Sequence, residues 1–182
     1  MQQGFIRRLL SLELEEKILN GGSLFALACV FFPWIGGEWL GGKTVTYSGL
    51  GFFTSFIGLT ILLLHVFILS LTIVPLAGGP AIIHKDKKDV ARLLAALFAS
   101  ALTVAIWSVH TKFTFEFSRL EIHFGLYGTL VGSLVTTLYC FLRHQDASKR
   151  RIEGMFHYGR HEEQHLPAPP PLPEPEEHRI HP

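Results

Sequence analysis

Residues 56–67 read FIGLTILLLHVF, and they lie at the centre of the longest stretch of the chain without Asp, Glu, Lys or Arg. That stretch runs for 41 residues between Lys43 and Lys85. Two membrane crossings here would need a turn in the middle, where the chain holds one glycine and no proline. The chain-breaking residues stand near the ends instead, at 48–49 and 78–80. The stretch therefore predicts one long, tilted helix from about residue 50 to residue 76.

Three further stretches lack these charged residues, and each suits a single crossing. They hold 20, 19 and 21 residues, and they lie between Lys17 and Glu38, between Arg92 and Lys112, and between Glu121 and Arg143. A helix needs about 20 apolar residues to cross the hydrocarbon core of a bilayer. The sequence thus predicts an all-α membrane protein, a four-transmembrane-helix bundle with spans at about 19–36, 50–76, 91–110 and 122–142.

The composition agrees with a chain that lies in lipid. Hydrophobic residues make up 48% of the 182 residues and charged residues 17%, against about 25% charged in ordinary soluble domains. The mean hydropathy is +0.32. A net charge of +1 excludes an overall electrostatic attraction to nucleic acid. Two cysteines cannot form a disulfide framework or a four-thiolate metal site.

The basic residues are unevenly distributed between the two sides of such a bundle. Four crossings place both termini and the connection at 77–92 on one side, which then carries 13 of the 16 Lys and Arg residues. Only Lys43, Lys112 and Arg119 fall on the other side. Because basic residues accumulate in cytoplasmic loops, both termini are expected in the cytoplasm.

Two segments next to the spans have patterns of their own. Residues 1–19 carry an apolar stripe that predicts a cytoplasmic or interfacial helix, and they are equally compatible with a helical extension of the first span. On the outer side, residues 43–48 and 111–118 both alternate polar and apolar side chains, which is the strand pattern. We expect them to pair as a short two-stranded β ribbon; the alternative is that the phenylalanines of 111–118 rest in the headgroup layer.

Residues 143–182 predict a cytoplasmic tail that is rich in His and Pro. It holds too few apolar residues to fold alone, so an extended conformation is expected. Within it, residues 167–175 read PAPPPLPEP, a polyproline II segment that suits docking into a groove of a partner. Contact with anionic lipid or with a partner is predicted for Lys149, Arg150, Arg151, Pro169, Pro170 and Pro171.

The same tail contains a motif with possible metal chemistry. Residues 161–165 match the H-E-x-x-H pattern of zinc metalloproteases, but Pro167 and the polar surroundings leave the motif without a core to hold its geometry. We therefore predict no catalytic residue, no enzyme activity and no cofactor. A helix would align His157, His161 and His165, which makes them candidate metal ligands; a solvated tail without metal is the alternative.

Within the spans, His65 is the one deeply placed residue that can carry a charge. A haem would need a second histidine at the same depth, and His110 and His123 fall near the ends of their spans. We expect a neutral His65 that bonds a Ser, Thr or backbone group across the bundle. Close helix contact is also predicted for Gly125, Gly128 and Gly132, of which the last two form a G-x-x-x-G pair.

Residues 31–34 read FFPW, and residues 47–50 read YSGL after a Gly-rich connection. This arrangement resembles small uncharacterised prokaryotic four-span membrane proteins, in which a Phe-x-Pro-Trp-like element ends the first span and Ser-Gly leads into the second. The resemblance covers less than a third of the chain and implies no activity. It implies a place in the prokaryotic plasma (inner) membrane. The topology also looks like that of claudin-type bundles, but their signature residues are absent.

Two functions are compatible with these patterns. The first is a non-catalytic membrane subunit that scaffolds, assembles or stabilises a larger membrane protein complex through its helices and its tail. The second is a small oligomeric transporter or channel. Because the span interiors lack acidic and basic residues, no proton relay or ion site is expected within one bundle. The first function is therefore the prediction, with the lipid bilayer and other membrane subunits as partners.

Overall fold

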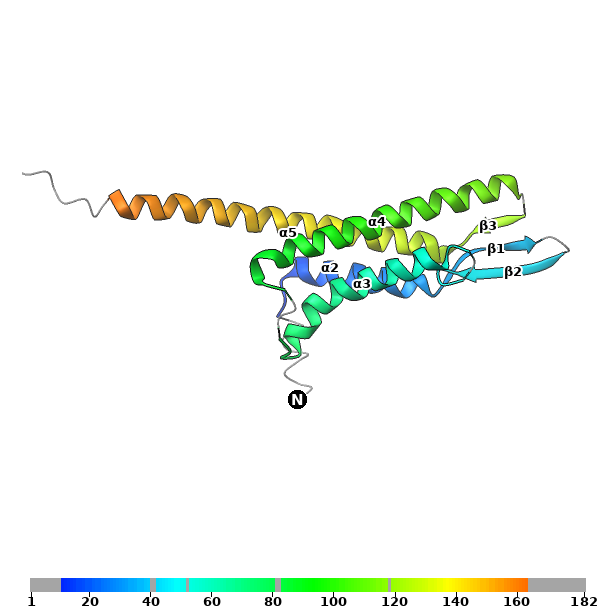
Figure 1. The fold of residues 1–182 in the computed structure, drawn as a ribbon, viewed down its shortest axis with the longest axis horizontal. Helices are drawn as coiled ribbons and strands as arrows, with labels where there is room; N and C mark the ends of the chain where they lie inside the picture. The colour runs from blue at the N-terminus through cyan, green and yellow to red at the C-terminus, as the bar shows by residue number, and fades with distance from the viewer. Residues whose placement is uncertain (1–10, 40–41, 52, 81–82, 118, 164–182) are drawn as a thin grey trace, which may run out of the picture. The chain divides into compact units, whose positions relative to one another are not determined.

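The computed structural model describes residues 11–39, 42–51, 53–80, 83–117 and 119–163. Four helices and a small sheet follow one another along the chain (Figure 1). In order, they are α2 (Leu14–Val30), β1 (Pro33–Trp39), β2 (Lys43–Ser48), α3 (Ser55–Leu76), α4 (Lys85–Glu116), β3 (Leu120–Ile122) and α5 (Phe124–Glu163). The chain divides into two compact units, residues 1–146 and 147–182. The first unit contains the sheet and the packed part of the bundle.

Among the described residues, three helices are long and apolar enough to cross a membrane: α3, α4, and the part of α5 up to residue 150. Helix α2 has 17 residues and is not among them. It ends at Val30 because Pro33 lacks a backbone N–H and forces the residue before it into an extended conformation. The chain therefore continues from residue 33 as a strand, where the sequence predicted helix up to residue 36.

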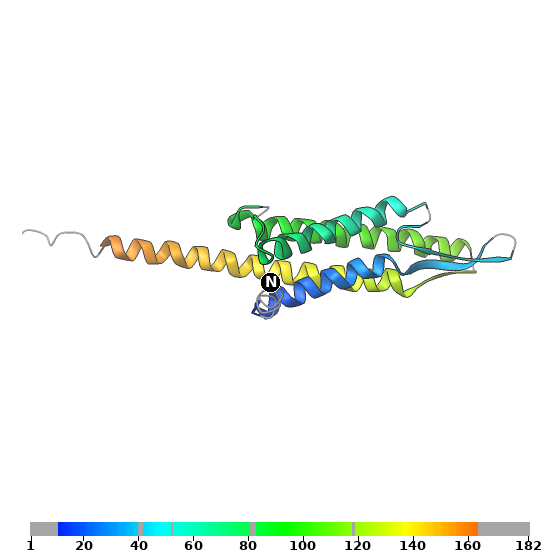
Figure 2. The same ribbon diagram turned by 90° about the horizontal axis from the view of Figure 1, so that it is seen from below.

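The sheet has three antiparallel strands in the order β2-β1-β3, and the strands lie at one end of the helices in both views (Figures 1 and 2). Strand β1 pairs with β2 from Pro33 opposite Ser48 to Trp39 opposite Lys43, and the register shifts between Pro33 and Ile35. Its other edge pairs with β3, with Ile35 opposite Ile122. We call this the sheet end of the bundle, and the opposite end, at Glu16 and Arg92, the charged end.

The predicted outer ribbon is half correct. Residues 43–48 do form a strand, but their partner is β1, and residues 111–116 belong to helix α4. Strand β1 closely precedes β2 in the chain, so this pairing closes a short loop, and the distant segment that joins the sheet is β3. At the end of α4, Phe113 stacks with Phe117, the residue just after the helix, with ring centroids 6.3 Å apart, and Lys112 lies 3.8 Å from Glu116. The alternating pattern of residues 111–118 is thus also compatible with contacts between residues i and i+4 at the end of a helix.

The first part of the predicted extended tail is helical. Helix α5 continues through residues 143–163, which are rich in residues with good helix propensity such as Ala147, Lys149 and Arg150. A polar helix needs no core of its own to keep its backbone hydrogen bonds. Residues 164–182, including the proline-rich segment, lie outside the described residues. So do residues 1–10 of the predicted N-terminal helix, whose last residues, 14–19, are the start of α2.

Helices α2 and α5 approach each other closely through glycines. A Cβ atom on Gly132 would lie 2.8 Å from the carbonyl oxygen of Gly22 and from the amide nitrogen of Ala26. A Cβ atom on Gly128 would lie 2.5 Å from the Cys29 sulfur, and one on Gly125 2.5 Å from the Pro33 carbonyl oxygen. About two turns of α5 therefore pack directly against the backbone and small side chains of the chain at residues 22–33.

This packing predicts a position-specific effect of adding a single methyl group. Gly132→Ala should lower the free energy of unfolding by about 1–3 kcal/mol, because its neighbours are backbone atoms that cannot move aside. Gly21→Ala is the matched control in α2, where the new methyl meets nothing within 4 Å and the helix should gain about 0.5–1 kcal/mol. Thermal unfolding in mild detergent measures both; an equal effect of the two substitutions would contradict the close approach.

Candidate functional site

The largest concentration of buried charge lies at the charged end. Arg92 of α4 is 1% exposed, and both of its terminal nitrogens donate to Glu16 Oε1 of α2 at 3.3 Å. The same guanidinium donates to the hydroxyl of Thr72 on α3. Glu16 is itself buried, with 7% exposure. Three helices are therefore joined by one buried ion pair and its hydroxyl partner, which we call the charged layer.

Helix α5 adds its own cation to this layer. Arg143 Nη1 lies 3.3 Å from Glu16 Oε2 and 3.4 Å from Glu13, and its Nε lies 3.5 Å from Asp89. Lys88 approaches Glu16 to 4.0 Å. Three carboxylates thus face three cations, so the cluster is close to neutral. It joins all four helices near the level at which α4 becomes apolar.

A second polar layer lies deeper, around His65 on α3. This side chain is fully buried, and its two ring nitrogens each lie 3.0 Å from a serine hydroxyl: Nδ1 from Ser23 of α2, and Nε2 from Ser133 of α5. A neutral imidazole donates from one nitrogen and accepts at the other, so both contacts are satisfied without charge. This is the kind of contact across the bundle that the sequence predicted for His65.

A third polar layer lies near the sheet end. Thr54, just before α3, has its hydroxyl 3.4 Å from Nε2 of His110 on α4, and both side chains are buried. The ring of Trp34 packs edge-on against His110 with centroids 6.5 Å apart, while its indole N–H donates to the carbonyl oxygen of Cys29 at 3.1 Å. This layer closes the bundle beneath the sheet.

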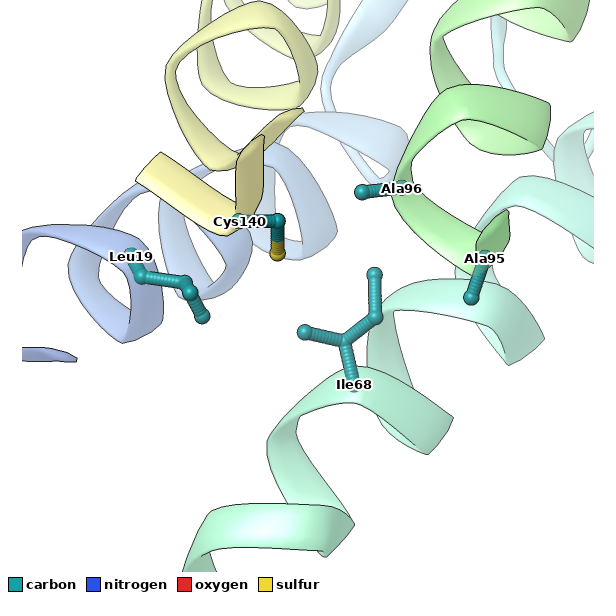
Figure 3. Packing of buried hydrophobic residues seen from close by; sticks show 5 residues of the cluster. All are labelled: Leu19, Ile68, Ala95, Ala96 and Cys140. Atoms are coloured by element: carbon teal, nitrogen blue, oxygen red, sulfur yellow. The ribbon is translucent and has the colours of Figure 1, made fainter. Parts of the chain in front are cut away.

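Two apolar layers separate these polar ones. Between the charged layer and His65 lies a cluster to which all four helices contribute, and its side chains point toward a common centre (Figure 3): Leu19, Ile68, Ala95, Ala96 and Cys140. Between His65 and His110 lies a second cluster, formed by Val30, Trp34, Ile61, Ile106 and Leu126. The order along α3 shows the alternation directly, since Thr72, Ile68, His65, Ile61 and Thr54 follow one another at helical spacing.

The hydroxyls between the helices are also satisfied. Thr103, Thr129 and Thr136 each donate to the carbonyl oxygen four residues earlier in their own helix at 2.8 Å. Ser100 and Thr137 bond each other between α4 and α5 at 2.8 Å. Within the described residues, no group of three or more His, Cys, Asp and Glu side chains could hold a metal ion. The geometry of this interior suits fixed helix packing.

The other predicted site residues are placed as follows. His157 and His161 lie within α5, and His165 lies outside the described residues. Lys149 and Arg150 are exposed on α5, with Arg151 next in the same helix. The predicted proline contacts, Pro169, Pro170 and Pro171, also lie outside the described residues. The structure thus brings together the packing residues, His65 with the three glycines, around α2 and α5.

Sequence reasoning missed the buried ion pair. It counted Arg92 only among the basic residues that set the orientation, and it assigned no role to Glu16. One available signal is position, because the first and third predicted spans run in the same direction and each residue lies near the start of its span. The sequence gives that shared depth, but it does not tell which faces of the two helices meet.

Comparisons of this chain with protein families, with curated proteins and with solved structures give no match.

The charged layer predicts unequal effects for its two central residues. Glu16→Gln should lower the free energy of unfolding by about 3–5 kcal/mol, because the buried Arg92 then loses its carboxylate. Arg92→Met should cost less, since Arg143 still pairs with Glu16 at 3.3 Å. The double substitution should recover part of the loss of Glu16→Gln. Thermal unfolding of the three variants gives the coupling between the two residues.

An exposed ion pair supplies the control for this cycle. Glu38→Gln removes the partner of Arg119, whose Nη1 lies 2.6 Å from Glu38 but whose side chain is 68% exposed. That change should cost less than about 1 kcal/mol. If Glu16→Gln were as mild as Glu38→Gln, the buried pair would not hold the helices together.

Proposed function

We propose that this chain is a non-catalytic integral membrane subunit that scaffolds, assembles or stabilises a larger membrane protein complex. It would cross the membrane four times, with α2 as the fourth span beside α3, α4 and α5, and both termini would be cytoplasmic. Its partners would be lipid and other membrane subunits, which it would meet through its helices and its C-terminal segment.

The observation that carries this proposal is the filled interior of the bundle. Polar groups from several helices meet in three layers. Apolar side chains from all four helices fill the two gaps between these layers. A transported ion or proton would need polar partners along its path, and the clusters around Ile68 and Ile61 interrupt such a path. The interior therefore suits a rigid element better than a conduit.

The packing of α2 supports its role as a span. Its buried residues contribute to four of the five layers: Glu16 to the charged layer, Leu19 to the first apolar layer, Ser23 to the His65 layer and Val30 to the second apolar layer. At 1.5 Å per residue the helix is about 25 Å long. The buried residues Trp34 and Ile35 of β1 continue this column toward the sheet end.

The distribution of charge supports the orientation. Lys43 and Arg119 lie in or next to the sheet, whereas Lys88, Arg92 and Arg143 lie at the charged end. With the charged end in the cytoplasm, the chain obeys the positive-inside rule.

The outer surface of the helices supports contact with apolar surroundings. Large apolar side chains are exposed along α3 and α4, among them Phe56 at 77%, Leu63 at 57%, Leu94 at 62% and Phe98 at 54%. On a water-soluble monomer such a surface would be unusually apolar. Lipid tails or the helices of neighbouring subunits would cover it.

The C-terminal half of α5 supports a contact on the cytoplasmic side. This part of the helix carries basic residues directly after the apolar stretch, with Lys149 and Arg150 exposed. Near anionic headgroups each such residue contributes about 1 kcal/mol of attraction. This basic part of the helix would be the binding element on the cytoplasmic side, together with the proline-rich segment that follows it in the sequence.

Purification of the native protein in mild detergent tests this function. We expect a stoichiometric set of other membrane proteins to co-purify with the full chain. A variant that ends at Arg151 should still insert, because α2 to α5 keep all their packing contacts, but it should lose these partners. A variant that ends at Glu163 separates the contribution of the helix from that of the proline-rich segment.

Two results would contradict the scaffold. Full co-purification with the chain that ends at Arg151 would show that the C-terminal segment is not a binding element. A lone homo-oligomer that conducts or transports in liposomes would favour the alternative function, a small oligomeric transporter or channel, with the pore formed between copies.

Accessibility of introduced cysteines tests the four-span topology. Cysteines at Lys43 and Glu116 should react with impermeant reagents from outside intact cells, and cysteines at Lys87 and Gln164 should not. The unsubstituted chain is the control, because both native cysteines, Cys29 and Cys140, are buried. Labelling at Lys87 from outside would overturn the topology.

A further inference from the structure

An amphipathic cavity opens beside the last turns of α4 at the sheet end. It has a volume of about 410 Å³ and is lined by three apolar and three polar side chains: Phe53, Val109, Phe113, Ser108, Lys112 and Glu116. Phe53 comes from the segment before α3, so the cavity lies where this segment meets α4. Nothing in the proposed function uses it.

The depth of the cavity is set by the length of α4. Lys112 follows the buried Arg92 by 20 residues, or about 30 Å along the helix axis. This distance matches the hydrocarbon thickness of a typical bilayer. When Arg92 lies at one boundary of the hydrocarbon, Lys112 and Glu116 lie at the other, at the level of the phospholipid headgroups.

The charges of the cavity form a loose pair. Lys112 Nζ lies 3.8 Å from Glu116 Oε1, and the two side chains are 78% and 54% exposed. An exposed i,i+4 pair contributes about 0.3–0.5 kcal/mol, so it exchanges readily for better partners. A ligand with one negative and one positive group would satisfy both residues, whereas a purely anionic ligand would meet the carboxylate of Glu116.

Aromatic rings complete the lining on the apolar side. Phe53 and Phe113 meet edge-on with centroids 5.1 Å apart. Aromatic faces attract ammonium groups, and this attraction adds to that of a neighbouring carboxylate. Val109 and the phenylalanines also offer apolar surface to the glycerol and the first carbons of an acyl chain.

We propose that this cavity binds the headgroup of a zwitterionic phospholipid, with its phosphate at Lys112 and its ammonium between Glu116 and the rings of Phe53 and Phe113. The hydroxyl of Ser108, one turn before Lys112, is a second donor on the phosphate side. The proposal rests on the membrane placement of α4 and is independent of any partner subunit.

Lipid titration by native mass spectrometry tests this site on the purified full chain in detergent. Dioleoylphosphatidylethanolamine should bind at one saturable site, and the Lys112→Gln/Glu116→Gln variant should bind it about tenfold more weakly, the change expected when a charged hydrogen-bond partner is lost. Dioleoylphosphatidylglycerol, which has no ammonium, should bind the unsubstituted protein more weakly than phosphatidylethanolamine.

The matched control removes the other exposed ion pair near the sheet end. Glu38→Gln/Arg119→Gln should leave phosphatidylethanolamine binding unchanged, because this pair does not line the cavity. Circular dichroism and gel filtration should show that both variants fold as the unsubstituted chain does. This readout needs no partner protein, so its result does not depend on the co-purification experiment.

Three results would overturn the proposal. The first is equal binding of phosphatidylethanolamine to the Lys112→Gln/Glu116→Gln variant. The second is binding of phosphatidylglycerol as tight as that of phosphatidylethanolamine. The third is complete displacement of the lipid by an equimolar amount of glycerophosphoethanolamine, which would assign the cavity to a soluble headgroup compound.

Discussion

A buried guanidinium must have a carboxylate beside it, and the charged end of this bundle is arranged to meet that need. Arg92 reaches Glu16 on α2 and Thr72 on α3, and Arg143 of α5 closes the cluster from the other side of the same carboxylate. Because an unpaired charge at this depth costs several kcal/mol, the four helices have little freedom to slide or rotate past one another. The His65 layer repeats the constraint without charge. Its two serines come from α2 and α5, and they fix the height of both helices against α3.

Helix α2 is too short to reach the sheet end, and strand β1 covers the remaining length. Pro33 ends the helix early, and the chain covers the remaining distance as a strand, in which each residue advances about 3.3 Å instead of 1.5 Å. Trp34 sits where the register shifts, and its indole lies in the core below the sheet, between Cys29 and His110. Strand β1 then holds both β2 and β3, so the same segment that lengthens α2 also ties the start of α3 to the start of α5.

The sequence was informative wherever one physical demand dominated. Uncharged stretches located α3, α4 and the apolar part of α5, because hydrocarbon tolerates few charges, and the last predicted residue of the second span, 76, is that of α3. The pattern at 111–118 misled, because residues 111–116 complete the last turns of α4, and Phe113 stacks on Phe117 just after the helix ends. The contacts of the charged layer could not be predicted. The sequence indicates how deep a residue lies along a span, but it does not indicate which neighbouring helix its side chain faces. The extended tail was wrong up to residue 163, because lack of apolar residues argues against a core and not against a helix.

The contact between Gly22 and Gly132 also has a consequence in time. The two glycines are 110 residues apart, and at about 5–20 residues per second the ribosome needs about 5–20 s to make the chain between them. During this interval the hydroxyl of Ser23 can already bond His65 of α3, but Gly22 of α2, the shortest of the four helices, faces a neighbour that does not yet exist. The hairpin of β1 and β2 and the contacts with α3 must hold it meanwhile. Helix α5 therefore completes the packing of the bundle, and α2 gains its final contacts only after α5 has been made.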